Sequence, residues 1–296
     1  MLPYNSAMSA LPFTSPAGMD LEGKASVLAQ RLRSLKRLLV AYSGGVDSAY
    51  LAWAAYQELG ADMLAVLADS PSLARSQMHD AIAFAAEQRI PLAVIRTGEM
   101  ERPEYVRNDG ARCFHCKDEL FTLMEDHRRR YGFDAIAYGV NLDDQGDYRP
   151  GERAALQHLV VAPLLEAGLS KADIRQLAAR AELRVWDKPA SACLSSRIEY
   201  GRPVTREALS AIEQGEDALR ELGFSQVRVR HHGQIVRIEI APEELSRAMT
   251  LEMAAEFTRI FKALGFSYVT LDLEGFRSGS MNAMLPVGSI RQPRQG

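Results

Sequence analysis

Short apolar runs alternate with longer stretches of helical periodicity through the first two thirds of the chain. The apolar runs are Leu38–Tyr42, Met63–Ala68, Leu92–Ile95, Ala135–Tyr138 and Leu159–Val161. Apolar residues at helical spacing fill residues 47–59, 72–89, 114–130 and 170–181, and several of these stretches end near Gly or Pro. Such alternation is typical of β-α-β units, in which helices join parallel strands. We therefore predict an α/β domain with five parallel strands and helices on both faces.

The pattern changes after Trp186, where a loop containing Pro and Ser leads into a different arrangement. The remainder predicts a smaller α+β domain, built from a helix (205–222), two strands (225–230 and 234–240), a helix (243–263) and a last strand (267–272). We place the boundary near residue 200. This gives a first domain at 19–200, a second domain at 201–296 and a loose tail over residues 1–18.

Composition agrees with two soluble globular domains and restricts the partners. The chain has 296 residues, of which 47% are hydrophobic and 25% charged, and its net charge is −3. Neither domain is basic enough to predict a nucleic-acid partner. No apolar run reaches the roughly 20 residues of a membrane span, and the N-terminus does not resemble a secretory signal. We therefore expect a cytoplasmic protein that binds neither nucleic acid nor membrane.

The strongest local motif is Ser43-Gly44-Gly45-Val46-Asp47-Ser48, which stands between the first predicted strand and the first predicted helix. Two adjacent glycines allow successive backbone N–H groups to point at one anion, and the start of the helix adds its positive dipole end. The motif therefore predicts a phosphate-binding loop. It lacks the Gly-Lys-Ser/Thr of a P-loop and the dinucleotide fingerprint. The alternative is a plain glycine turn with Asp47 as the helix cap.

Polar side chains follow two other strands of the predicted sheet. Asp69 follows the second strand, and the fourth strand is followed by Asn141, Asp143, Asp144 and Asp147. In an open parallel sheet the ligand crevice lies beyond the carboxyl ends of the strands, where these side chains would collect. They are candidates for contacting adenosine or Mg²⁺, although a polar turn explains the second group equally well.

Three cysteines form an odd and sparse set that does not resemble a secreted disulfide framework. Cys113 and Cys116 form a C-x-x-C pair at a predicted helix start, and Cys193 lies in the loop that leaves the first domain. Three thiolates would hold a [4Fe–4S] cluster with one iron left open, and an open iron can carry an extra sulfide. Two alternatives stay open, namely zinc completed by a histidine and Cys193 acting alone.

Arginines in the second domain form the remaining candidate site. Val227, Arg228, Val229 and Arg230 alternate strictly, so both valines point to one face of a strand and both arginines to the other. Paired guanidinium groups suit phosphate or carboxylate ligands, and Arg197 could join them. A solvated strand face is an equally good explanation.

With these motifs in hand, the chain resembles the LarE-type ATP-dependent sulfur transferases, which belong to the PP-loop or N-type ATP pyrophosphatase superfamily. The resemblance covers about residues 24–285 and rests on the glycine loop and four further segments, 112–117, 138–151, 188–197 and 271–280. The PP-loop alone is shared with NAD synthetase, GMP synthetase and tRNA-thiolating enzymes. Specificity therefore comes from the cysteine-containing loop and the late segment.

The resemblance implies an adenine nucleotide alpha hydrolase-like fold and a defined reaction. That family uses ATP and Mg²⁺ to adenylate a carboxylate of a pyridinium-3,5-dicarboxylate mononucleotide, and then replaces AMP with sulfur. Its product becomes the nickel-pincer cofactor of lactate racemase. On this resemblance Asp47 would hold Mg²⁺, and pyrophosphate would be held by Ser43, Gly44, Gly45, Val46 and Ser48.

The family has two kinds of member. In one, a lone cysteine at the position of Cys193 gives up its sulfur and becomes dehydroalanine; in the other, three cysteines hold a [4Fe–4S] cluster. The presence of Cys113, Cys116 and Cys193 favours the cluster kind. The resemblance also implies an external sulfur donor and a homo-oligomer.

Three rival functions remain on sequence grounds. A tRNA 2-thiolating enzyme shares the three cysteines, but the chain lacks a basic surface pattern. An amide-forming ligase related to NAD synthetase would use the cysteines only structurally, and its product would contain no new sulfur. A nucleotide-binding sensor would not cleave ATP.

Overall fold

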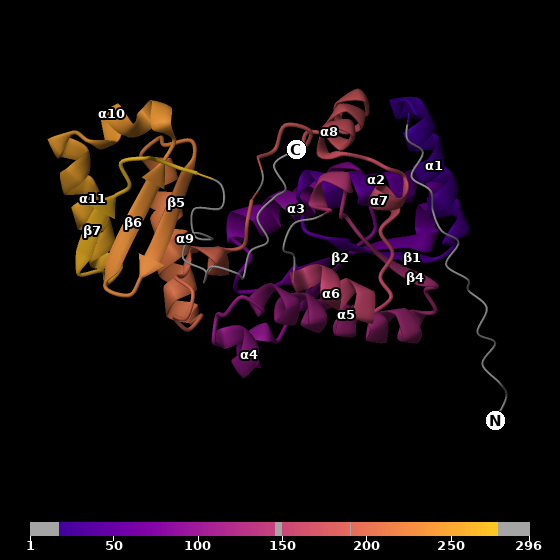
Figure 1. Cartoon of the computed structure of the whole chain (residues 1–296), viewed down its shortest axis with the longest axis horizontal. Coiled ribbons are helices and arrows are strands. Elements are labelled where there is room, and N and C mark those ends of the chain that lie inside the picture. The colour runs from indigo at the N-terminus through magenta and orange to yellow at the C-terminus, as the bar shows by residue number, and fades with distance from the viewer. Residues whose placement is uncertain (1–17, 146–149, 190, 278–296) are drawn as a thin grey trace.

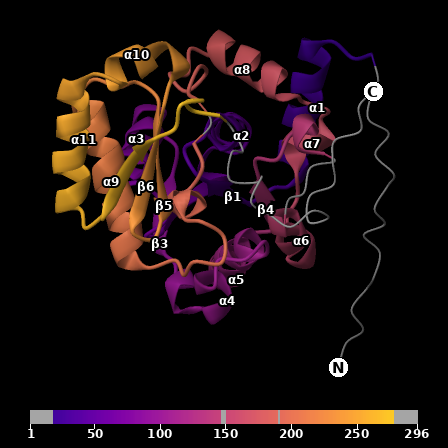
Figure 2. The same cartoon turned by 60° about the vertical axis from the view of Figure 1, so that its left-hand side comes forward.

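The computed structural model describes residues 18–145, 150–189 and 191–277. Two domains lie side by side, each with its own sheet, and Figures 1 and 2 show them from two directions. The predicted tail, residues 1–18, falls outside the described residues except for Gly18. Among the described residues no helix is both long and apolar enough to cross a membrane.

The sheet of the first domain contains four parallel strands in the order β3-β2-β1-β4. The strands are β1 (Leu38–Tyr42), β2 (Met63–Asp69), β3 (Leu92–Arg96) and β4 (Ala135–Tyr138). The predicted parallel α/β architecture is confirmed, but the structure has four strands here and not five.

The predicted fifth strand is reduced to a single bridge between Val161 and Ala137. Val161 donates to Ile136 O at 2.9 Å and accepts from Tyr138 N at 3.1 Å. Leu159 has a φ of +51° directly before this point, and Pro163 begins the next helix directly after it. Too few extended residues remain between these two features to continue the ladder.

Helices cover both faces of this sheet. One face packs against α1 (Leu21–Ser34), α2 (Val46–Leu59), α3 (Arg75–Glu87) and α8 (Lys171–Arg180). The other face packs against α5 (Arg112–Tyr131) and α6 (Pro150–Gln157). Alternation along β1 serves both layers, because Leu38 and Val40 point to the first face and Leu39 to the second. Short helices α4 (Pro103–Val106) and α7 (Pro163–Glu166) complete the domain.

The four predicted helices of the first domain are confirmed as α2, α3, α5 and α8, with ends that shift by up to three residues. Helix α3 begins at Arg75 and not at residue 72, because Ser70 and Ser72 form a turn in which Ser72 N donates to Ser70 Oγ at 3.0 Å. Helix α1 was not predicted. Its signal was the cap at Asp20, whose side chain accepts from Gly23 N at 2.9 Å.

The second domain has a three-stranded sheet in the order β5-β6-β7, in which β5 and β6 are antiparallel and β6 and β7 parallel. Its elements are α9 (Arg206–Glu221), β5 (Val227–His232), β6 (Ile235–Ile240), α10 (Leu245–Ala248), α11 (Leu251–Ala263) and β7 (Tyr268–Leu271). The predicted helix 243–263 is divided, because Thr250 caps a new helix by accepting from Met253 N at 3.3 Å.

Within residues 18–145, 150–189 and 191–277, five short 3-10 helices connect these elements. They are η1 (Gly60–Asp62), η2 (Glu99–Glu101), η3 (Leu142–Asp144), η4 (Leu194–Arg197) and η5 (Pro242–Glu244). Leu194 and Ile198 pack into the apolar core of the second domain although they precede the boundary predicted near residue 200. The segment that joins the two domains is therefore anchored, through Leu194 and Ile198, in the apolar core of the second domain.

The direction of the fold reverses between β1 and β4. The chain moves outward from β1 to β2 and β3, and then returns to place β4 on the other side of β1. Ligands of open parallel sheets bind at such a switch point. The two loops meet closely there, since a Cβ on Gly139, directly after β4, would lie 2.8 Å from Ser48 N in α2.

Gly139→Ala should therefore push the start of α2 away from β4 and lower the free energy of unfolding by about 1–3 kcal/mol, the usual cost of overpacking. Gly98→Ala is the matched control, because its Cβ would meet the ends of two side chains and no backbone, namely carboxylate oxygens of Glu119 at 3.3 Å and Glu101 at 3.8 Å. Urea denaturation of both variants measures the effect. Equal stability of the two variants would contradict the close approach.

Candidate active site at the carboxyl edge of the sheet

The glycine loop after β1 is held by its own serines. Gly44 has a φ of +72°, and a Cβ at this position would lie 2.6 Å from Ala81 Cβ, so no other residue fits without a shift. Ser48 Oγ accepts from Ser43 N and donates to Gly45 O, both at 3.1 Å. The loop thus takes a fixed shape before helix α2, whose first-turn N–H groups and dipole favour an anion.

Asp47 lies in the first turn of α2 and meets two other elements. Its Oδ2 pairs with Lys171 Nζ at the start of α8, while its Oδ1 is buried and has no hydrogen-bond partner among the described residues. The backbone N–H of Lys171 donates to Asp143 Oδ2, in η3, at 2.7 Å. Residues that follow β1 and β4 are therefore joined through one lysine.

The other predicted polar residues that the structure describes lie at the strand ends, with Asp69 as the last residue of β2, and each has a protein partner. Asn141 is 2% exposed and accepts from Asp143 N at 2.9 Å, while Asp144 accepts from Asn141 N at 3.0 Å. These contacts form the cap of η3. Asp69 pairs with Arg75 at 2.6 Å. Their contact with adenosine or Mg²⁺ stays a prediction, and Asp147 lies outside the described residues.

The three cysteines lie within electrostatic range of one another. Cys113 and Cys116 occupy the first turns of α5, and Cys193 directly precedes η4. Burial raises the pKa of Cys116, and the charge of Cys193 raises it further; the same two causes raise the pKa of Cys113. Leu194 N donates to Ser72 O at 2.8 Å, which attaches the Cys193 loop to the turn after β2. The thiols therefore gather at the same edge of the sheet as the glycine loop.

Cys193 differs from the other two cysteines in its charge state. Burial opposes its ionisation, but the guanidinium of Arg112 and the hydroxyl of Ser195, 3.1 Å from Cys193 Sγ, outweigh this and hold the pKa of Cys193 below its usual value. Cys113 and Cys193 are closely surrounded by protein but still reach solvent. A thiolate at Cys193 is consequently the most available nucleophile or metal ligand of the three.

A buried clamp fixes the start of α5 against the Cys193 loop. Asn108 is fully buried at a φ of +57° and donates to Glu199 O and Arg202 O, both at 2.9 Å. Its side-chain oxygen accepts from Arg112, which also donates to Ser195 O at 2.9 Å. Asn108 and Arg112 therefore set the separation between the Cys113–Cys116 pair and Cys193.

No group of three or more His, Cys, Asp or Glu side chains is arranged to hold a single metal ion in the described part of the chain. A tetrahedral zinc site needs four such ligands around one point. This finding does not distinguish the zinc alternative from the three-cysteine cluster, and both stay predictions.

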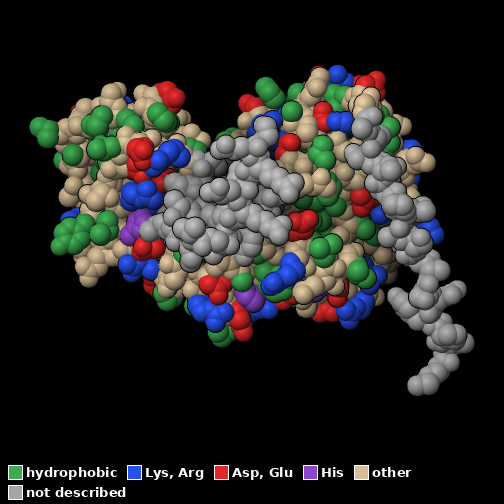
Figure 3. Space-filling view, viewed as in Figure 1, with side chains coloured by type: hydrophobic (Ala, Val, Ile, Leu, Met, Phe, Trp, Pro, Cys, Tyr) green, Lys and Arg blue, Asp and Glu red, His purple; other side chains and the backbone are tan. Residues whose placement is uncertain are grey.

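The predicted alternation along β5 is confirmed, since Val227 and Val229 are buried in the core of the second domain. Arg230 is also buried and pairs with Glu239 at 2.7 Å. Burial, together with the nearby charge of Arg197, lowers the pKa of Arg228 to about 10. In Figure 3 the near face of this domain shows basic and acidic side chains interspersed beside the first domain.

Arg197 is fully buried and makes an ion pair with Glu216 through two contacts, at 2.9 and 3.2 Å. It also donates to Cys193 O at 2.7 Å. The structure therefore gives Arg197 a clear role in holding the Cys193 loop to α9, while substrate binding by all three predicted arginines stays a prediction.

Comparison with known proteins adds the family. No family model matches the chain. A pyridinium-3,5-bisthiocarboxylic acid mononucleotide synthase of Lactiplantibacillus plantarum is 34% identical over 266 residues, which cover 90% of this chain and 96% of that protein. The chain belongs to this synthase family. Uncharacterized proteins of Synechocystis and Methanocaldococcus jannaschii are 42% and 30% identical, over 90% and 82% of this chain and 99% and 92% of their own lengths.

Within this member of the synthase family, sequence reasoning missed Lys171, Asn108 and Glu216. Glu216 could have been recognised in the sequence, because it interrupts the apolar stripe of α9 between Ile212 and Leu219. Lys171 left a weaker signal, since a lysine at the first position of a helix opposes the helix dipole. Asn108 left none, because its partners are backbone carbonyls distant in sequence.

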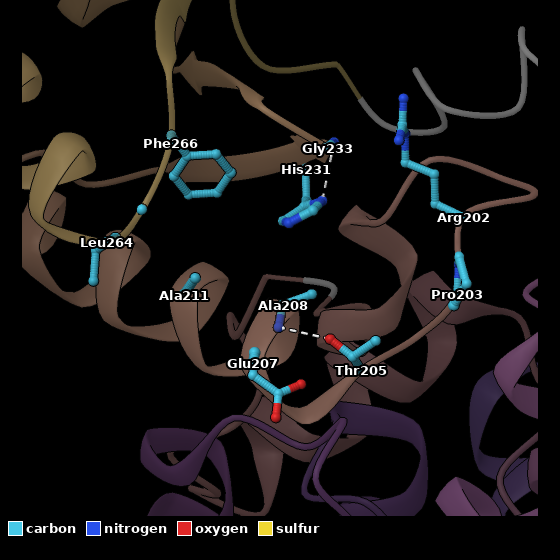
Figure 4. Close-up of a pocket in the computed structure, with 11 residues that line it drawn as sticks. Arg202, Pro203, Thr205, Glu207, Ala208, Ala211, His231, Gly233, Leu264 and Phe266 are labelled. Carbon is cyan, nitrogen blue, oxygen red and sulfur yellow. Dashed lines mark hydrogen bonds between the residues drawn. The ribbon is translucent and has the colours of Figure 1, made fainter.

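A hollow of about 330 Å³ lies on the second domain, and Figure 4 shows its lining. His231 and Phe266 stand on one side and Ala208 and Ala211 of α9 on the other, with Arg202 at the margin. No residue of the glycine loop and no cysteine lines it. We place the site by its chemistry and not by this hollow.

Glu216→Gln should lower the free energy of unfolding at neutral pH by about 3–5 kcal/mol, because it leaves the buried charge of Arg197 without its partner. Asp217→Asn is the matched control, since the pair of Asp217 with Arg220 is exposed and should contribute less than about 1 kcal/mol. Denaturant titration of both variants checks the difference.

The pH dependence of the free energy of unfolding provides a second test of the Arg197–Glu216 ion pair. Burial raises the pKa of Glu216, but the charge of Arg197 outweighs burial and holds the pKa below its usual value. Its contribution is therefore present above the unfolded value of about 4.3 and is lost as the pH falls through the folded value. The gap between wild type and Glu216→Gln should shrink at acid pH, and a constant gap would contradict this.

Proposed function

We propose that the chain is an ATP-dependent sulfur transferase that adenylates a carboxylate of a pyridinium-3,5-dicarboxylate mononucleotide and replaces AMP with sulfur. One observation carries the proposal. The glycine loop follows β1, and the loop that carries Cys193 is bonded to the turn after β2, so the two loops lie at the carboxyl edge of one sheet. The Lactiplantibacillus relative is a pyridinium-3,5-bisthiocarboxylic acid mononucleotide synthase, which supports the same chemistry.

The residues fit a role for Mg²⁺ at Asp47. Its buried Oδ1 lacks a hydrogen-bond partner among the described residues, and carboxylate oxygens are the ligands that Mg²⁺ prefers. When bound, Mg²⁺ would offset charge on the ATP phosphates. The glycine loop, with Ser43 and Ser48, would hold the pyrophosphate half of ATP so that AMP stays with the carboxylate.

The cysteines likewise fit a [4Fe–4S] cluster held by Cys113, Cys116 and Cys193. Thiolates are the usual ligands of such clusters, and the charge of Cys193 acts on both Cys113 and Cys116. When bound, the cluster would supply an open iron able to carry sulfide from an external donor. Ser195 and Arg112 would keep Cys193 in the thiolate form that ligation requires.

The chemistry of the substrate sets the order of the reaction, and arginines of the second domain would hold the substrate. A carboxylate resists attack by sulfur until AMP is attached as a leaving group, so activation must come first. The substrate carries phosphate and carboxylate groups, which suit the cations Arg228 and Arg230. Glu239 fixes the position of Arg230, and Arg197 increases the positive charge near Arg228.

With ATP, Mg²⁺ and the pyridinium-3,5-dicarboxylate mononucleotide, the protein should release AMP and pyrophosphate. Asp47→Asn should reduce this release by about 100-fold or more, the usual loss when one electrostatic contact to a reacting group is removed. Asp62→Asn, whose side chain is 65% exposed in η1 beyond the far end of α2, should leave the rate unchanged. Chromatography of the nucleotides decides the point, and ADP with orthophosphate as the main products would reject the proposal.

Cys193→Ala should stop thiolation but still allow release of pyrophosphate that depends on substrate, because activation precedes sulfur transfer. Cys113→Ser should remove iron and sulfide from the anaerobically purified protein, since a cluster needs all three thiolates. Iron analysis and mass spectrometry after reaction measure both effects. A loss of about 34 Da corresponds to conversion of cysteine to dehydroalanine, and it would show that Cys193 is sacrificed and that no cluster delivers the sulfur. An amidated product without sulfur would reject both sulfur-transfer mechanisms.

A further inference from the structure

Lys171 binds the carboxylate that the proposed function assigns to Mg²⁺. Its ammonium group pairs with Asp47 Oδ2, in a pocket of protein where the lysine side chain is 34% exposed and the aspartate 19%. The lysine comes from α8 and the aspartate from α2, so the pair joins two helices on the same face of the sheet.

The position of Lys171 is poorly explained by the stability of α8 itself. It is the first residue of the helix, where the dipole disfavours a positive charge. The helix start is already capped, because Ser170 Oγ accepts from Asp173 N at 3.1 Å and Asp173 accepts from Ser170 N at 3.0 Å. The hydrogen bond from the backbone N–H of Lys171 to Asp143 Oδ2 then fixes the backbone from which the lysine side chain extends. The lysine is therefore best explained by its partner Asp47.

Lysine and a divalent cation cannot both neutralise Asp47 at low cost. Two like charges a few ångströms apart repel near a protein surface, and a divalent ion doubles the repulsion felt by a single positive charge. Partial exposure of Lys171 reduces the repulsion without removing it. A cation bound at Asp47 Oδ1 would lie beside the ammonium group on Oδ2, and the repulsion between the two favours release of Lys171.

We propose that Lys171 is a gatekeeping residue of the PP-loop: it neutralises Asp47 until nucleotide arrives and must release the carboxylate before a divalent cation binds there. The proposal rests on the function proposed above. The phosphates of ATP supply the negative charge that draws Lys171 away. Metal entry is thereby coupled to nucleotide entry, and Lys171 acts as a positioning residue.

Mn²⁺ binding to the protein without nucleotide tests this inference directly. Mn²⁺ accepts the same oxygen ligands as Mg²⁺, and the loss of its free electron paramagnetic resonance signal reports binding. Lys171→Met removes the charge but keeps the apolar stem, and should bind Mn²⁺ at least about tenfold more tightly than wild type, a conservative figure for removing a nearby like charge. Lys171→Arg keeps the charge and should bind like wild type.

The carboxylate provides the control. Asp47→Asn combined with Lys171→Met should lose the gain, because the gain depends on Asp47. Circular dichroism shows that each variant is folded before titration. The proposal is overturned if Lys171→Met binds Mn²⁺ no more tightly than wild type, or if the gain survives in the double variant.

Failure here is distinguishable from failure of the proposed function. The titration uses neither ATP nor the mononucleotide, so it reads the exchange of cations at Asp47 alone. Release of AMP and pyrophosphate with no gain in Mn²⁺ affinity would leave the sulfur transferase proposal intact and remove only the role of Lys171.

Discussion

Parallel strands joined by crossover helices must all end at the same edge of their sheet, and this constraint assembles the site. The glycine loop leaves β1, the Asn141 cap leaves β4, and the turn after β2 bonds to the Cys193 loop. Because the strand order reverses between β1 and β4, the loops that follow these two strands run in opposite directions along the sheet and border the same space. The close approach of Gly139 to α2 shows how little room the backbone leaves there.

Buried charged groups fix the position of the Cys193 loop where the first domain meets the second. Arg197 is fully buried, pairs with Glu216 of α9 and binds the carbonyl of Cys193. A buried ion pair adds little net stability over apolar packing, but it tolerates few alternative geometries. The Arg197–Glu216 pair therefore defines where the Cys193 loop joins the second domain. The clamp of Asn108 and Arg112 does the same from the side of α5.

The sequence predicted the β-α-β order and the glycine loop because both are local patterns, one of apolar spacing and one of adjacent residues. It failed at Leu159–Val161, where a positive φ and Pro163 leave a bridge in place of a strand. It also missed contacts between distant residues. Lys171 meets Asp47 across 124 positions, and neither neighbourhood in the sequence refers to the other. Burial of Arg197 was equally hidden, since a polar loop surrounds it in the chain.

The Cys193 loop is fastened at both ends to different bodies. Leu194 N is bonded to the turn after β2, whereas Arg197 is paired with α9 of the second domain. Cys113 and Cys116, by contrast, belong to a long helix packed on the first sheet. Cys193 is held through its neighbour Leu194 on one side, and on the other side through its own carbonyl, which accepts from Arg197. A rotation of one domain against the other would therefore act on Cys193 from both sides and change the distance of its sulfur from those of Cys113 and Cys116.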